Sequence, residues 1–181
     1  MPSIRPIPSV LALVLALLLA AGAGAEIGTL ETGGFTLDHE VVLPGTPDAI
    51  YDALTGDISG WWDHSFSEHP LRFYIDPKPG GGFYEIFDES GDGVLHATVT
   101  FAKRGEWLRF HGPLGLSGYA VDMYHSYRLE PVGEDSTKFH LSVRAVGEEN
   151  EKWASVVDQV WRHFLFERFV PYVEGGFKPL D

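Results

Sequence analysis

The residues best suited to chemistry lie between Tyr119 and Glu130, where apolar and polar side chains alternate. Side chains of a strand point alternately to its two faces, so Met123, His125 and Tyr127 share one face. The apolar residues on that face predict that it points inward. An imidazole and a phenol among apolar walls can orient a ligand carbonyl or hydroxyl group, or transfer a proton near neutral pH. The alternative interpretation is that both are wall residues whose polar atoms are paired within the protein.

Glu85 is the third candidate for proton transfer. It lies between Phe83 and Phe87 on one face of a predicted strand. If that face points inward, the apolar surroundings raise the pKa of the carboxyl group, which can then act as a general acid or base. Tyr84 and Ile86 form the alternative inner pair, and Glu85 then points the other way.

A histidine on the following strand, His96, is expected to be solvated. It lies on the opposite side from Val99 and Phe101 and shares its face with Thr98 and Thr100. We interpret it as a histidine at a solvated edge. A second polar group in an internal cavity is the alternative.

An aromatic cluster is expected where Trp61, Trp62, Phe66 and Tyr74 come together. Its functional interpretation is a cavity mouth that grips a planar or aliphatic ligand, and the alternative is ordinary core that closes one end of the fold. The glycine-rich loop Gly112–Gly118 is expected to be a flexible hairpin that gates this opening.

Four potential metal ligands, Asp63, His64, Glu68 and His69, lie within seven residues. Histidines and carboxylates are common metal ligands. However, the sequence has no HExxH or HxH pattern, and the surrounding residues are typical of a solvated loop. The chain also has no cysteine, which excludes a thiol nucleophile, an iron–sulfur cluster and a cysteine-based zinc site. We therefore predict no metal site and no cofactor.

The negative net charge limits the classes of binding partner that we expect for this chain. Lysine and arginine number 13 against 26 acidic residues, a formal charge of −13. Without a basic surface the chain is not expected to bind nucleic acid or an anionic lipid surface. Its 44% hydrophobic content is that of an ordinary globular protein.

The first 25 residues have the features of a secretory signal peptide. Arg5 precedes an apolar run at 10–21, and Ala23-Gly24-Ala25 fits the pattern of a cleavage site. We expect cleavage after Ala25 and export to the periplasm or the medium, with a retained anchor as the alternative. No membrane span is expected in the mature chain.

The mature chain predicts a strand, two short helices, six more strands and a long helix. Thr46-Pro47-Asp48 is typical of a helix start, and Asp57 can cap a second short helix that runs into Trp61-Trp62. Short turn-rich connections between the later strands require antiparallel neighbours. The strands are expected at Phe35–Leu43, Leu71–Ile75, Phe83–Phe87, Val94–Ala102, Trp107–His111, Tyr119–Glu130 and Thr137–Ala145.

The long helix is expected over 150–173, where apolar residues that include Trp161 and Leu165 recur at helical spacing. Such a helix buries its apolar side by lying across the inner face of the sheet. We therefore predict an α+β helix-grip fold, in which a curved antiparallel sheet wraps around the helix and leaves a ligand-sized gap. The expected divisions are a signal peptide (1–25), a short extension (26–33), the domain (34–175) and a tail (176–181).

This order of elements, together with several short motifs, resembles the START-like SRPBCC superfamily. The motifs are Trp61-Trp62, the DPKPGGG turn at 76–82, HATVTF at 96–101, LRF at 108–110 and GPLG at 112–115. Within the superfamily the sequence is most similar to the polyketide cyclase/dehydrase branch. It is also similar to the C-terminal domain of AHA-type activators of the ninety-kilodalton heat-shock chaperone. The resemblance implies a hydrophobic cavity for small apolar or amphipathic ligands.

The leading hypothesis is an exported domain that binds a small hydrophobic or amphipathic molecule between the sheet and the long helix. One alternative is an enzyme of cyclase or dehydratase type that uses His125 with Tyr127 or Glu85. Another is a protein-binding module of the co-chaperone kind. The expected ligand-binding residues are Trp61, Trp62, Phe66, Tyr119, Met123, His125, Tyr127, Trp161 and Leu165.

Overall fold

The computed structural model describes residues 28–148 and 152–180, and residues 31–181 form one compact unit. The predicted signal segment 1–25 lies outside the described residues. Within the part of the chain that is described, no helix is both long enough and apolar enough to cross a membrane.

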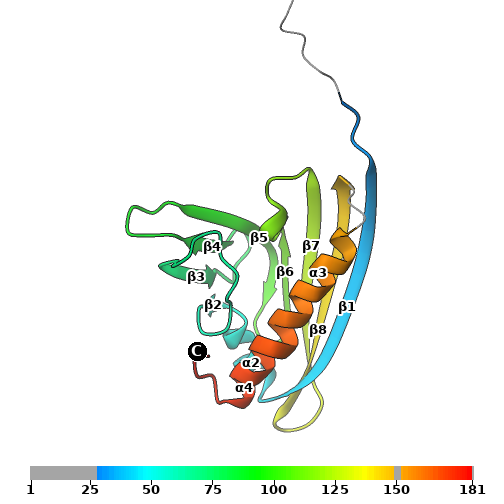
Figure 1. Ribbon diagram of the computed structural model, residues 1–181. Helices are drawn as coiled ribbons and strands as arrows, with labels where there is room; N and C mark the ends of the chain where they lie inside the picture. The colour runs from blue at the N-terminus through cyan, green and yellow to red at the C-terminus, as the bar shows by residue number, and fades with distance from the viewer. Residues whose placement is uncertain (1–27, 149–151, 181) are drawn as a thin grey trace, which may run out of the picture. The chain divides into compact units, whose positions relative to one another are not determined.

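A single eight-stranded antiparallel sheet forms the larger part of the unit (Figure 1), with the strand order β1-β8-β7-β6-β5-β4-β3-β2. Each strand from β3 to β7 pairs with the next one along the chain, as the short connections predict. β1 forms one edge of the sheet and pairs with β8 along its whole length. The strands are β1 (Thr32–Pro44), β2 (Gly56–Asp57), β3 (Arg72–Ile75), β4 (Gly82–Ile86), β5 (Gly93–Lys103), β6 (Trp107–His111), β7 (Val121–Pro131) and β8 (Ser136–Glu148).

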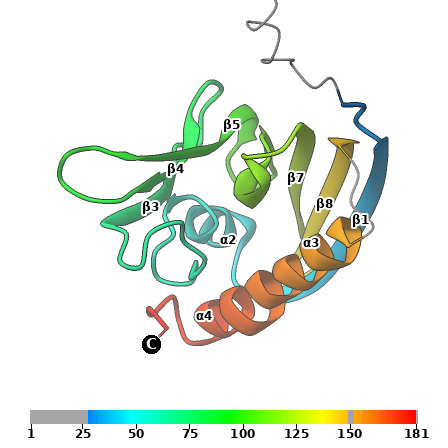
Figure 2. The same cartoon turned by 45° about the horizontal axis from the view of Figure 1, so that its top comes forward.

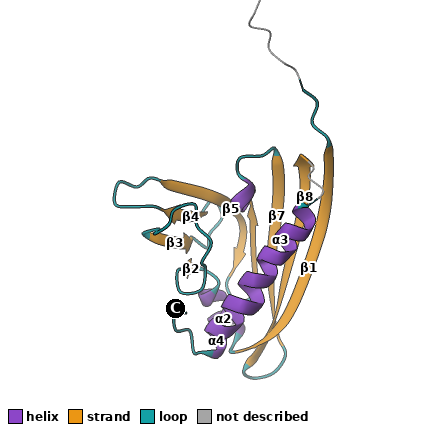
Figure 3. Ribbon diagram, in the orientation of Figure 1, coloured by secondary structure: helices purple, strands orange, loops and turns teal. Residues whose placement is uncertain are grey.

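The C-terminal helix lies across the concave face of this sheet (Figures 2 and 3). It consists of α3 (Trp153–Arg162), a π-helical segment η2 (His163–Phe169) and α4 (Val170–Glu174). The side that faces the sheet buries large apolar residues, which explains why the helix stays on the sheet. These residues are Val157, Trp161, Phe164, Leu165, Phe169 and Val173.

The region between β1 and β3 differs from the expectation of two short helices. The first helix is α2 (Pro47–Ala53), where the Thr46 hydroxyl accepts a hydrogen bond from the Ala49 amide at 3.3 Å. The second predicted helix, starting at Asp57, does not form. Instead, the two-residue strand β2 pairs with β3, and the chain then turns so that the Trp62 amide donates to the Ile58 carbonyl at 3.0 Å. Pairing with the sheet edge has overridden the local helix signal.

Candidate ligand-binding cavity

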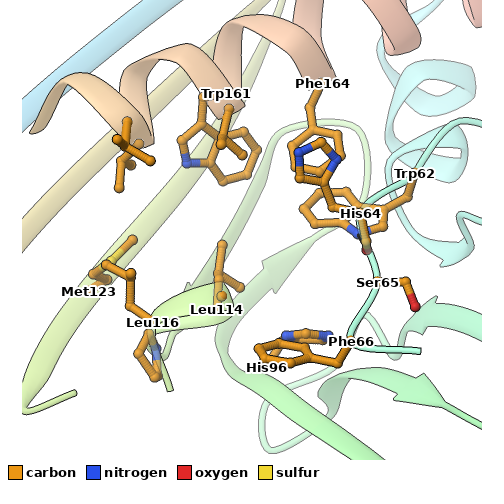
Figure 4. Close-up of a pocket in the computed structure, with 15 residues that line it drawn as sticks. Trp62, His64, Ser65, Phe66, His96, Leu114, Leu116, Met123, Trp161 and Phe164 are labelled. Atoms are coloured by element: carbon orange, nitrogen blue, oxygen red, sulfur yellow. Dashed lines mark hydrogen bonds between the residues drawn. The ribbon is translucent and has the colours of Figure 1, made fainter. Parts of the chain in front are cut away.

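A cavity of about 290 Å³ lies between the C-terminal helix and the sheet (Figure 4). Its walls come from α3, the start of η2, β5, β7, the loop after β2 and the loop between β6 and β7. Most of the lining is apolar or aromatic. The lining residues are Trp62, His64, Ser65, Phe66, His96, Pro113, Leu114, Gly115, Leu116, Met123, Val156, Val157, Val160, Trp161 and Phe164.

The C-terminal helix forms one apolar wall of the cavity. Val156, Val157 and Val160 fall on one side of α3, and Trp161 and Phe164 follow on the next turn. In Figure 4 the rings of Trp161 and Phe164 point from the helix toward the opposite loop. The predicted apolar face of this helix therefore forms part of the cavity wall. The three valines were not predicted as ligand-binding residues.

The loop between β6 and β7 forms the opposite wall. Where the sequence predicts a flexible hairpin, residues Leu114–Leu116 form a 3₁₀ turn, η1, and both leucines line the cavity. The loop starts close against β5, since a Cβ atom on Gly112 would lie 2.5 Å from the His96 carbonyl oxygen. Leu114 adopts a φ of 49°, a conformation that non-glycine residues rarely hold.

Two of the four predicted aromatic residues, Trp62 and Phe66, line the cavity. Trp62 stacks on Phe164 with ring centroids 3.7 Å apart, which ties the loop after β2 to the helix. Trp61 instead belongs to the core, where its ring lies 4.9 Å from that of Phe169. Tyr74 stacks on Tyr84 away from the cavity.

Glu85 is completely buried beneath the loop after β2. Its Oε1 accepts hydrogen bonds from the Ser65 hydroxyl at 2.6 Å and from the backbone amides of Phe66 at 2.9 Å and Ser67 at 3.2 Å. Its Oε2 lies 3.1 Å from Nε2 of His96. The face of β4 that carries Phe83 and Glu85 is therefore the inner one. Of the two interpretations drawn from the sequence, the one that points Glu85 inward is confirmed. The carboxylate anchors the loop that carries Phe66.

His96 lies inside the protein, and the expectation of a solvated histidine is wrong. The register between β4 and β5 shifts at this point, because Phe83 pairs with Ala97 whereas Tyr84 pairs with Leu95. His96 is the extra residue of the bulge, and a bulge redirects its side chain. The imidazole is 5% exposed, and its ring stacks under that of Phe66 with centroids 5.7 Å apart.

The surroundings of His96 favour its neutral form. Burial lowers the pKa of the imidazole, and the hydrogen bonds with Glu85 and with the backbone of Leu114 oppose this effect without reversing it. Through these two contacts His96 connects the loop after β2 with η1. The two walls of the cavity mouth are thus joined by one buried pair of side chains.

His125 and Tyr127 lie on the inner face of β7, as the alternation predicts, but neither lines the cavity. The His125 ring stacks on Phe110 with centroids 4.7 Å apart, and its Nε2 lies 3.3 Å from the Gly112 carbonyl oxygen. Its Nδ1 has no hydrogen-bond partner among the described residues. Burial lowers the pKa of His125 to about 3 and raises that of Tyr127.

The remaining predicted ligand-binding residues lie at different depths. Met123 and Trp161 line the cavity. Leu165 is buried in the core and does not line the cavity. Tyr119 is 52% exposed and packs edge-on against Trp153, with centroids 4.9 Å apart, and so lies outside the cavity.

At the cavity mouth, the structure brings Asp63 and His64 together with His163 of the helix. The His163 Nε2 lies 2.9 Å from Asp63 Oδ2, and its Nδ1 lies 2.8 Å from Glu167 Oε2. The hydrogen bond with Glu167 raises the pKa of His163. Sequence reasoning missed His163, because it lies 100 residues from Asp63 and no local pattern marks it.

No family model matches the chain, and no curated protein matches it. Solved structures do. An uncharacterised protein from Rhizobium leguminosarum has a TM-score of 0.62 at 15% identity, over 82% of this chain and 99% of that one. The Aha1 dimer from Colwellia psychrerythraea gives 0.56 at 20% identity, over 78% and 98%. CalU16 from Micromonospora echinospora gives 0.54 at 14% identity, over 81% and 84%.

At these identities the likeness concerns the fold alone. The alignment covers nearly all of the Rhizobium and Colwellia chains and 84% of the Micromonospora chain. Curved antiparallel sheet and C-terminal helix are therefore shared as one unit. The architecture of this chain is consistent with the START-like helix-grip fold that its sequence resembles.

Proposed function

We propose that this protein binds a small apolar or amphipathic molecule in the cavity between the C-terminal helix and the sheet. The observation that supports this most is a space of about 290 Å³ with walls of valine, leucine, methionine and aromatic side chains. Ligand pockets are concave, mostly apolar and furnished with a few polar groups. An engineered apolar cavity of about 150 Å³ holds benzene, so a molecule of about two rings fits the volume here.

The polar part of the ligand is proposed to lie at the mouth. His64 and Ser65 border the cavity there, and the buried ring of His96 lies behind them. The deeper walls at Met123 and Trp161 are apolar, so an amphipathic molecule gains most by entering with its apolar end first. His125 and Tyr127 act in this proposal as support for the wall and make no contact with the ligand.

A cyclase or dehydratase would need two titratable groups that reach one substrate position. Neither His125 nor Tyr127 lines the cavity, and the Glu85 carboxylate is covered by the loop it anchors. The three residues proposed for catalysis therefore do not favour the enzyme over the binding protein. Export remains part of the proposal and rests on the basic, apolar and small-residue pattern of 1–25.

The test is native mass spectrometry of the chain purified from the cells that make it. We expect a co-purified apolar molecule, which Val160→Trp displaces because the indole fills the cavity from the helix side. The matched control is Val42→Trp, which places the same side chain at an exposed position on β1 outside the cavity. A chain without any bound small molecule, or a Val160→Trp variant that retains it as well as Val42→Trp does, would contradict the proposal.

A further inference from the structure

Three side chains with metal-ligating atoms meet where the loop after β2 contacts the helix. The ligand atoms of Asp63, His64 and His163 all lie within 4.8 Å of one another. His64 Nδ1 is 2.9 Å from Asp63 Oδ1, and His163 Nε2 is 2.9 Å from Asp63 Oδ2. In a tetrahedral zinc site with bonds of about 2.1 Å, the ligand atoms lie about 3.4 Å apart. Side-chain rotation alone can therefore bring the three atoms around one ion.

His163 is already oriented as metal-bound histidines are. Its Nδ1 lies 2.8 Å from Glu167 Oε2, one turn further along the helix, and this contact directs Nε2 toward Asp63. A carboxylate on the far nitrogen is the usual outer partner of a metal-bound histidine, because it fixes the ring and raises its basicity. His163 also begins the π-helical segment, and such segments are frequent at functional sites.

Both nitrogens of His163 face carboxylate oxygens, which can only accept hydrogen bonds. The lone pair of a neutral Nε2 and the oxygens of Asp63 therefore point at the same place. A positive species is needed between them, and it is either a proton or a metal ion. This arrangement distinguishes the cluster from an ordinary group of surface acids.

The surrounding charge also suits a dication. Asp63 and Glu167 contribute two negative charges, and Arg168 contributes one positive charge. The Arg168 Nε lies 3.3 Å from Asp63 Oδ2 and 3.3 Å from the Trp61 carbonyl oxygen. The guanidinium contacts Oδ2 only, whereas Oδ1 faces both His64 Nδ1 at 2.9 Å and His163 Nε2 at 3.0 Å. With neutral imidazoles the cluster keeps a net negative charge.

We infer that Asp63, His64 and His163 form a binding site for a divalent ion of the late first transition row, tested here as Zn²⁺. Two imidazoles and one carboxylate are ligands that Zn²⁺ accepts, and three protein ligands leave a fourth position open. The site lies at the edge of the cavity, because His64 belongs to both. It does not depend on a ligand in the cavity.

Isothermal titration calorimetry of the chelator-treated chain with Zn²⁺ tests this site. We expect about one ion per chain, at least tenfold weaker binding in His163→Ala, and about tenfold weaker binding in Glu167→Gln, since loss of an outer partner typically costs that much. His64→Ala, at a half-exposed position, provides a second ligand variant. Absorption spectra of the Co²⁺ form report directly whether nitrogen ligands bind the ion.

The matched control is His69→Ala, which removes an exposed histidine of the same loop from outside the cluster. It is expected to bind Zn²⁺ within about twofold of the original chain. The inference fails if the original chain binds no Zn²⁺ up to about 1 mM, or if His69→Ala weakens binding as much as His64→Ala and His163→Ala. Because the titration uses no cavity ligand, either result leaves the proposed function untouched.

Discussion

The buried imidazole of His125 makes the stability of the fold depend on pH. Burial lowers its pKa from 6.5 to about 3, because β6, β7 and the helix exclude water from the ring. In the unfolded chain the imidazole takes up a proton near its ordinary pKa. Between these two values the unfolded state holds more protons than the native state, so the free energy of unfolding falls as the pH falls.

The size of the effect follows from the shift. Each pH unit below 6.5 costs about 1.4 kcal/mol, so between about pH 7 and about pH 4 His125 alone removes about 3 kcal/mol. His96 contributes with the same sign, since burial lowers its pKa too. His125→Gln isolates the first contribution, because the amide nitrogen can still donate to the Gly112 carbonyl but does not titrate.

Urea unfolding followed by tryptophan fluorescence at several pH values measures the contribution of His125 to the pH dependence of the free energy of unfolding. We expect His125→Gln to lose about 3 kcal/mol less than the original chain over the same pH interval. His69→Gln, which changes an exposed histidine, is expected to keep the original pH dependence. If His125→Gln and the original chain lose equal stability on acidification, the reasoning about a buried neutral imidazole is refuted.

Three further substitutions test how the cavity walls are held. Glu85→Ala is expected to lower the free energy of unfolding in urea by about 3 kcal/mol, since it leaves the buried His96 and three part-buried donors of the loop without their acceptor, and a loss below about 1 kcal/mol would contradict this. Trp161→Ala is expected to cost about 3 to 5 kcal/mol in the same assay, because it empties the centre of the helix–sheet contact. Gly112→Ala places a Cβ atom 2.6 Å from Ala97 Cα, so the melting temperature is expected to fall; an unchanged value would show that the backbone at Gly112 can shift away from β5.

The sheet and the long helix could be predicted because their signals are local. The alternation along 119–130 gives the inner face of β7 correctly, and the bounds of β6 agree residue for residue with the expectation. Helical spacing of apolar residues located the C-terminal helix. The π-helical segment of this helix could not be predicted, because the spacing of apolar residues shows only which side of a helix is buried.

The details that build the cavity depend on contacts between distant segments. The second short helix was predicted from Asp57, but Gly56–Asp57 pairs with β3 as the strand β2 and the chain then turns instead of forming a helix. The bulge that turns His96 inward needs the register of β4 against β5, which the sequence does not reveal. His163 reaches Asp63 only because the helix crosses the sheet. In each case tertiary packing decided what local propensity left open.

The measurement that tests the central claim most directly is methyl NMR of the chain titrated with 2-naphthol, a two-ring molecule with one hydroxyl group. The account predicts that the methyl signals of Leu116, Met123 and Val157 shift together and saturate, and that Val42→Trp shows the same shifts while Val160→Trp shows none. Unchanged signals from these three residues, or shifts that persist in Val160→Trp, would contradict a ligand-binding cavity between the helix and the sheet.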